Sequence, residues 1–252
     1  MIIIKTEKEI AIMREGGKIL AKIMAEIGRA VGPGRNTLEL EKLAERLVFD
    51  NRALPAFKGQ GEKNNPYPAV TCISLNDEIV HGIPREEKII KEGDLVKVDI
   101  GMEYKGLITD MARTFEVGAV SPLAHKLSKV TREALDQGIK KIRAGALLND
   151  YSQTVESYVR TFGFSVVRDL VGHGVGKKLH EDPQIPNYKS GRKDITLEAG
   201  MTLALEPMIN EGTFKIKILP DGWTFATEDG KLSAHFEDTV LVRKGGCEML
   251  TR

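Results

Sequence analysis

The same succession of element types occurs twice along the chain. Apolar residues that step by three or four predict helices, and alternating β-branched residues predict strands. In the first half these patterns give helices at 6–31 and 37–51, then strands at 69–75, 95–100 and 107–117. In the second half they give helices at 121–142 and 150–162, then strands at 201–206, 214–219, 223–227 and 235–242.

This repeat predicts an α+β fold made of two pseudo-symmetric helix-helix-strand halves, at about 1–120 and 121–252. The predicted helix starts have recognisable caps. Thr6 and Glu9 have the spacing of a capping box, Thr37 is the expected N-cap of the second helix, and Ser121 precedes a proline at the first helical position. We expect the halves to form one domain with a site between them.

Composition restricts the class of protein. With 252 residues, 41% of them hydrophobic, the chain can bury a substantial core. The 37 basic and 36 acidic residues nearly cancel, so no strong attraction to nucleic acid or membrane is expected. No signal peptide or long apolar run is visible, and Cys72 and Cys247 are too few for a disulfide framework, although one bridge between them stays open. These features predict a cytoplasmic protein.

Each half contributes two acidic residues to strands that are predicted to be buried. They are Asp99 and Asp110 in the first half, and Glu206 and Glu237 in the second. Buried carboxylates are rare unless they are paired or bound to a cation, and four together would repel one another. Any one of them could instead be a turn cap, a salt-bridge partner or a solvated strand residue. Their matching places in the two halves favour a site for divalent ions such as Mn²⁺, Fe²⁺ or Co²⁺.

The five histidines are unequal candidates for such a site. His173 lies between two glycines, where the backbone can approach a ligand closely, and His180 follows seven residues later. His81 ends a strand-like run, whereas His125 is expected on a helix surface and His235 at a solvated strand position. The glycines around His173 resemble a phosphate-binding loop, but the Lys-Ser/Thr that such a loop needs is absent.

Together these residues resemble the methionine aminopeptidases. The five ligand positions of that family correspond in order and spacing to Asp99, Asp110, His173, Glu206 and Glu237. The surrounding segments match as well, among them Cys72-Ile-Ser-Leu-Asn, His81-Gly-Ile-Pro, Gly172-His-Gly-Val-Gly, His180-Glu-Asp-Pro and Asp221-Gly-Trp-Thr. The resemblance covers nearly the whole chain and is similar to the short, bacterial-type class I form. It implies the pita-bread fold, in agreement with the repeat.

The resemblance also implies a metal centre and a reaction. Two divalent ions (cobalt, manganese, iron or zinc) would be bridged by Asp110 and Glu237. Asp99 would complete one site, and His173 with Glu206 the other. A water or hydroxide between the ions would be the nucleophile that removes the N-terminal methionine from nascent proteins.

Three residues would assist this reaction. Glu206 would shuttle a proton, His180 would donate to the scissile carbonyl oxygen, and His81 would lie near the scissile nitrogen.

A pocket for methionine is implied at Tyr67, Cys72 and Trp223, with His81 at its edge and room only for a small second residue beyond. Without the resemblance, Trp223 and Cys72 would be interpreted as core residues. One departure affects the rim. The segment 58–66 is longer than usual, with Asn64 and Asn65 where aromatic or imidazole side chains are common.

Three other functions remain open at this point. A proline dipeptidase or aminopeptidase P shares the fold but typically has an additional N-terminal domain. A non-catalytic binding module would have lost its metals, although all five ligand positions are intact. A nucleic-acid binder would need a basic patch. We expect nascent N-termini as substrate, no nucleic-acid or membrane partner and a monomer, and leave docking at the ribosome open.

Overall fold

A curved antiparallel sheet forms the centre of the molecule in the computed structural model, which describes residues 2–191 and 194–252. Its main path runs in the order β1 (Leu54–Pro55), β6 (Leu95–Tyr104), β7 (Leu107–Glu116), β16 (Glu237–Arg243), β11 (Thr202–Leu205), β9 (Gly172–Gly174) and β10 (Glu181–Ile185). Two further strands join it, since β4 (Thr71–Leu75) pairs with β6 and β17 (Gly246–Met249) pairs with β16. The strands of the two halves meet where β7 pairs with β16.

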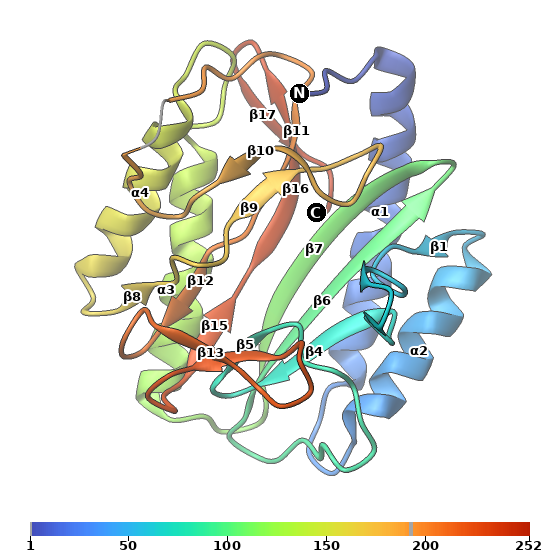
Figure 1. The fold of residues 1–252 in the computed structure, drawn as a ribbon, viewed down its shortest axis with the longest axis vertical. Helices are drawn as coiled ribbons and strands as arrows, with labels where there is room; N and C mark the ends of the chain where they lie inside the picture. Colours follow the sequence, from blue (N-terminus) through green and yellow to red (C-terminus); the bar gives the residue numbers. More distant parts are fainter. Residues whose placement is uncertain (1, 192–193) are drawn as a thin grey trace.

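Four helices in the described residues flank the sheet: α1 (Glu7–Ala30), α2 (Thr37–Asp50), α3 (Pro122–Ile139) and α4 (Leu148–Arg160). Figure 1 shows α1 and α2 beside the strands of the first half, and α3 and α4 beside those of the second. The predicted helix-helix-strand order is therefore present twice, with residue 120 falling between β7 and α3. No helix in the described part of the chain combines the length and apolar character that a membrane crossing requires.

The helix caps agree with the sequence except at α2. Thr6 and Glu9 form the predicted capping box, and Ser121 caps α3 in front of its proline. The prediction of Thr37 as N-cap is wrong, because Asn36 accepts the bond from the backbone N–H of Glu39 at 2.9 Å. Asparagine is the better cap, and the hydroxyl of Thr37 is instead bonded to the backbone of residue 85.

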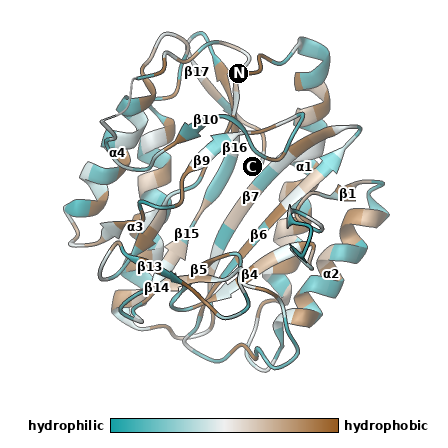
Figure 2. Ribbon diagram, viewed as in Figure 1, coloured by the Kyte–Doolittle hydropathy of each residue, from teal (hydrophilic) through white to brown (hydrophobic). Residues whose placement is uncertain are grey.

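The core is built by one buried side of each helix. In α1, Ile10, Leu20 and Ile27 are at most 1% exposed and recur at helical spacing. Figure 2 accordingly shows hydrophobic and hydrophilic bands alternating along α1 and α2. Most of the core lies in two large clusters, one in each half, so the strands that carry the acids rest on a packed base.

Three small sheets complete the fold. They are β8 (Ser165–Val166) with β12 (Met208–Asn210) and β15 (Ser233–His235), β5 (Glu78–Val80) with β14 (Phe225–Thr227) and β13 (Ile216–Ile218), and the hairpin of β2 (Gly61–Glu62) and β3 (Asn65–Pro66). The strand predicted at 235–242 is in fact divided between β15 and β16 at Phe236. Strands β9 and β10 were not predicted, because glycine-rich and charged segments have low strand propensity.

Candidate metal centre and substrate site

Three acids come from neighbouring strands of the central sheet. Asp99 of β6 and Glu237 of β16 both lie opposite Ala112 of β7. Asp110 precedes Ala112 by two residues, so its side chain is on the same face of the sheet. Strand register therefore brings carboxylates of both halves onto one surface.

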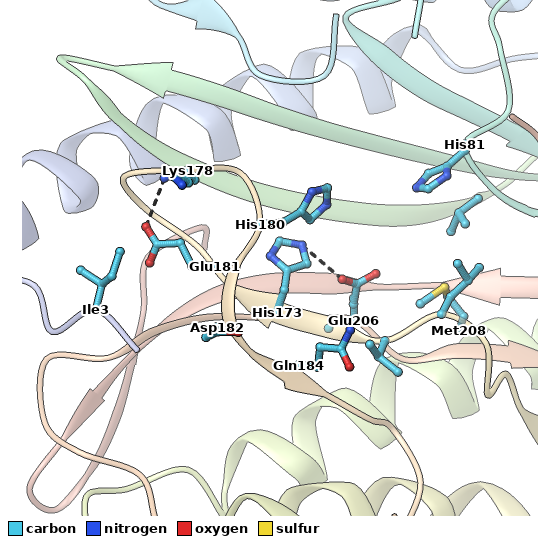
Figure 3. A pocket seen from close by; sticks show the side chains of 14 residues that line it. Ile3, His81, His173, Lys178, His180, Glu181, Asp182, Gln184, Glu206 and Met208 are labelled. Carbon is cyan, nitrogen blue, oxygen red and sulfur yellow. Dashed lines mark hydrogen bonds and ion pairs between the residues drawn. The ribbon is translucent and has the colours of Figure 1, made fainter. Parts of the chain in front are cut away.

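The other two predicted ligands extend this set across β11 and β9. His173 is opposite Ala204, and Glu206 follows Ala204 by two residues. The Nε2 atom of His173 is 3.4 Å from Oε1 of Glu206 (Figure 3). All five predicted ligands line one pocket, namely Asp99, Asp110, His173, Glu206 and Glu237.

The donor set fits a divalent cation. Ligand atoms of Asp110, His173 and Glu237 lie within 4.8 Å of one another. One buried carboxylate oxygen in each of Asp99, Asp110 and Glu237 has no hydrogen-bond partner among the described residues. Such oxygens are unfavourable in a protein interior unless something compensates their charge. Oxygen donors with one imidazole suit Mn²⁺, Fe²⁺ or Co²⁺.

Electrostatics support the same interpretation. Burial, and then repulsion by neighbouring acids, raises the pKa of Asp99, Glu206 and Glu237 well above the usual range, and burial raises the pKa of Asp110 to about 7. Burial lowers the pKa of His173 to about 4, so its imidazole is neutral near pH 7. Neutral imidazole is the form that binds metals.

Two more histidines face the ligands. The ring centroids of His180 and His173 are 4.5 Å apart, and the two rings are edge-on. Burial lowers the pKa of His180, and it lowers the pKa of His81 to about 4. Both side chains line a cavity of about 500 Å³, and Figure 3 shows His180 next to His173 and His81 at one end of the view. As neutral imidazoles, both can donate an N–H to a bound substrate.

The pocket that the five predicted ligands line is narrow, with a volume of about 90 Å³. Its walls also include Tyr67, Cys72 and Trp223, as the resemblance implies. The ring centroids of Tyr67 and Trp223 are 5.1 Å apart, and the two rings are edge-on. The hydroxyl of Tyr67 donates a hydrogen bond to the carbonyl of Thr71 at 3.0 Å. These rings form an apolar slot next to the predicted metal ligands.

The long segment 58–66 forms the β2–β3 hairpin at the rim of this pocket. Asn64 and Asn65 are exposed and are not among the residues that line the pocket. Gln60 lines the pocket instead, and a side chain on Gly61 would collide with the ring of Trp223. No sequence signal marked Gln60.

The prediction for His235 is wrong. Its side chain is 1% exposed, and its Nε2 is 3.8 Å from Oε2 of Glu206. Neither ring nitrogen has a hydrogen-bond partner in the described residues, and burial lowers the pKa to about 3. The two-residue step to Glu237 was the signal that could have placed it on the ligand face. His125 is exposed as expected and is bonded to Glu116.

Comparison with known proteins places the chain in a class. The model of metallopeptidase family M24 matches residues 11–244. The chain therefore belongs to the metallopeptidase family M24, and use of a divalent metal follows from that membership.

Within this family the chain is similar to proteins named methionine aminopeptidase. Those of Clostridium acetobutylicum and Bacillus subtilis are each 44% identical, over 100% of this chain and 99% and 100% of theirs. The structure of methionine aminopeptidase from Thermotoga maritima superposes with a TM-score of 0.96 at 45% identity, over the full length of both chains.

A prolidase from Pyrococcus horikoshii is more distant, with a TM-score of 0.78 and 25% identity over 99% of this chain and 63% of that one. These likenesses confirm the predicted pita-bread fold and the resemblance to the methionine aminopeptidases.

Proposed function

We propose that the protein removes the N-terminal methionine from newly made polypeptides by metal-dependent hydrolysis. The observation that carries the proposal is the position of the five predicted ligands beside a narrow apolar slot. The slot suits an unbranched thioether, because sulfur packs favourably against aromatic edges such as those of Tyr67 and Trp223. A peptide whose first side chain fills it would have its first peptide bond next to the acids.

The acids and His173 would hold two divalent ions. Asp110 and Glu237 would lie between the ions, Asp99 would complete one site, and His173 and Glu206 the other. When bound, the ions supply polarisation of a carbonyl and activation of a water near neutral pH. Cobalt, manganese, iron and zinc remain the candidate metals.

The chain's own side chains would move protons and hold the substrate. Glu206, whose carboxylate is in the cavity, would accept the proton of the attacking water and later give it to the leaving amine. His180 would donate an N–H to the scissile carbonyl oxygen as that atom gains negative charge. His81 would lie near the leaving nitrogen. Because these groups are largely buried, the reacting bond would be shielded from bulk water.

Substrate preference beyond methionine follows from the same surroundings. The second residue of the peptide would lie beside His81 and His180, which both line the pocket of about 90 Å³, and we propose a small side chain there. Nascent N-termini are thus the proposed partner. Docking at the ribosome, a monomeric state, a cytoplasmic location and the absence of a nucleic-acid partner stay predictions.

Peptide hydrolysis by apo-protein, titrated with Mn²⁺, Fe²⁺, Co²⁺ and Zn²⁺, tests the proposal. We expect metal-dependent release of methionine from Met-Ala-Ser and no cleavage of Ala-Pro peptides. Preferential cleavage before proline would assign the chain to the prolidase-like activity instead. Equilibrium dialysis that detects no tightly bound divalent ion would indicate a binding module without catalysis.

A further inference from the structure

The N-terminal arm, defined here as residues 2–5, lies against the active site although no motif marked it. Ile3 lines the same cavity as His173, His180 and Glu206. Figure 3 shows Ile3 and Glu181 at one end of this cavity and His81 at the other. The arm is fixed in place by its backbone, since the N–H of Lys5 donates to the carbonyl of Gly200 at 2.9 Å.

A buried ion pair joins this arm to the segment after β9. The Nζ atom of Lys5 is 2.5 Å from Oε2 of Glu181, and the two side chains are only 1% and 2% exposed. Burial lowers the pKa of Lys5, whereas the hydrogen bond and the negative charge of Glu181 act in the opposite direction. Removing one partner of such a pair is strongly unfavourable, because the other charge stays buried without compensation.

Glu181 in turn closes the turn that carries His180. Its other oxygen, Oε1, accepts the backbone N–H groups of Lys177 at 2.6 Å and Lys178 at 3.1 Å. One carboxylate therefore holds both sides of the turn 177–181, and His180 directly precedes it in sequence.

Lys5 also packs against the residue where this turn begins. Any side chain on Gly176 would collide with the Lys5 stem. The carbonyl of Gly176 accepts a bond from Ile108 of β7 at 2.7 Å, which fixes the turn relative to the acids. Another ion pair in this region, Lys177 with Glu9, has a lysine that is 51% exposed, and exposed pairs contribute little.

We propose that Lys5 is a positioning residue for the peptidase reaction: through Glu181 it holds the turn that places His180 over the cavity. This inference rests on the proposed function, since it assumes the role of His180. Lys5 itself is not among the residues that line the narrow pocket of the predicted ligands.

Steady-state kinetics of Lys5→Met on Met-Ala-Ser, with the enzyme fully loaded with metal, test the proposal. A displacement of His180 by about 1 Å would lower kcat by about 10- to 100-fold while KM changes by less than about threefold. Arg14→Met is the matched control, because Arg14 on α1 forms a 2.5 Å ion pair with Glu248 and neither residue lines the cavity or the narrow pocket. Its kcat should equal that of the wild type.

The double variant Lys5→Met/Glu181→Gln separates positioning from simple loss of a buried pair. It leaves no uncompensated charge, so we expect its Tm to recover toward the wild-type value while kcat stays low. Recovery of kcat together with Tm would overturn the proposal, as would a Lys5→Met enzyme with wild-type kcat.

Hydrogen exchange provides a readout that does not depend on activity. Amides of residues 177–181 should exchange faster in Lys5→Met than in the wild type. In Arg14→Met their exchange rates should equal those of the wild type. If the wild type hydrolysed no peptide, the proposed function would fail while this measurement still tested the role of Lys5. Unchanged exchange in Lys5→Met would contradict it.

Discussion

At the scale of single residues, Asp110 is the acid with neighbours on both sides. It shares one face with Asp99 of its own half and Glu237 of the other. Asp110→Asn keeps the shape of the side chain, but it replaces the carboxylate that two cations would share with a neutral amide. We expect Mn²⁺ affinity to fall by more than the 10- to 100-fold typical of outer-shell changes, and turnover to disappear.

Equilibrium dialysis with Mn²⁺ measures this effect. Asp136→Asn is a suitable control, because Asp136 is a partly exposed ion-pair partner of Arg252 outside the site. An Asp110→Asn protein that binds two ions with undiminished affinity would contradict the bridging role.

His180 should show the opposite behaviour. Because it faces the cavity without belonging to the predicted ligand set, His180→Ala should retain the metals. Loss of a donor to a developing oxyanion typically lowers kcat by about 100- to 1000-fold. Metal content and kcat measured on the same sample check both statements, and full activity would rule out the assigned role.

Residue identity was predictable where the sequence pattern broke a physical rule. Acids inside apolar strands, such as Asp99 and Glu206, are conspicuous because burial without compensation is unfavourable. Gln60 breaks no rule, so nothing in the sequence placed it in the pocket. His235 was assigned to solvent although its two-residue step to Glu237 favoured the buried side, where its Nε2 lies 3.8 Å from Oε2 of Glu206.

At the scale of elements, the β2–β3 hairpin forms the rim of the proposed methionine slot. Gly61 lies against Trp223 and has a positive φ of 95°. Gly61→Ala should displace either the hairpin or the indole. We expect KM for Met-Ala-Ser to rise by about 10-fold, equivalent to roughly 1.4 kcal/mol of binding, with a smaller effect on kcat.

Gly59→Ala is the matched control for this measurement. Gly59 has a φ of 87° in the same segment, but a side chain there would meet nothing within 4 Å. It reproduces the backbone strain without the contact to Trp223. Equal KM values in the two alanine variants would show that strain, and not the rim contact, is responsible.

Elements with a strong period were predictable and irregular ones were not. All four helices and the long strands β6 and β7 follow from their apolar spacing. The strands that carry or follow the histidine, β9 and β10, contain glycine, proline and charged residues, and β9 is held as a strand by its pairing with β11 and β10. Tertiary contacts therefore override weak local propensity where the site is built.

At the scale of the whole molecule, metal binding should depend on pH. Asp110 has a pKa of about 7, and the pKa values of Asp99, Glu206 and Glu237 are well above their usual range. These carboxyl groups therefore carry protons in the metal-free protein, and bound ions must displace them. His173, with a pKa of about 4, is already neutral and contributes no proton in this window. Affinity for Mn²⁺ should therefore rise between about pH 5.5 and about pH 7.5, by up to about 10-fold per pH unit for each proton released.

Calorimetric titrations at several pH values, in buffers of different ionisation enthalpy, count the released protons. Glu41→Gln is the control, because Glu41 is another buried acid whose pKa burial raises, but it is bonded to Thr71 and is not among the predicted ligands. The slope of Mn²⁺ affinity against pH in Glu41→Gln should match that of the wild type. A Mn²⁺ affinity that is flat across this range would show that the acids are already ionised without metal.

The overall architecture was the most predictable level, since two helix-helix-strand successions can bury their faces in few ways. The division near residue 120 remains a prediction, and so does the number of bound ions.

The junction between β7 and β16 limits how such a chain can diverge during evolution. In the described strands, β7 and β16 are paired at two positions, Glu237 with Ala112 and Asp238 with Met111. A substitution that shifts one half would move Asp99 and Asp110 relative to Glu206 and Glu237. A change in one inner strand therefore requires a compensating change in the strand of the other half. The outer edge at β1 carries no such constraint and is where inherited variation in length should accumulate.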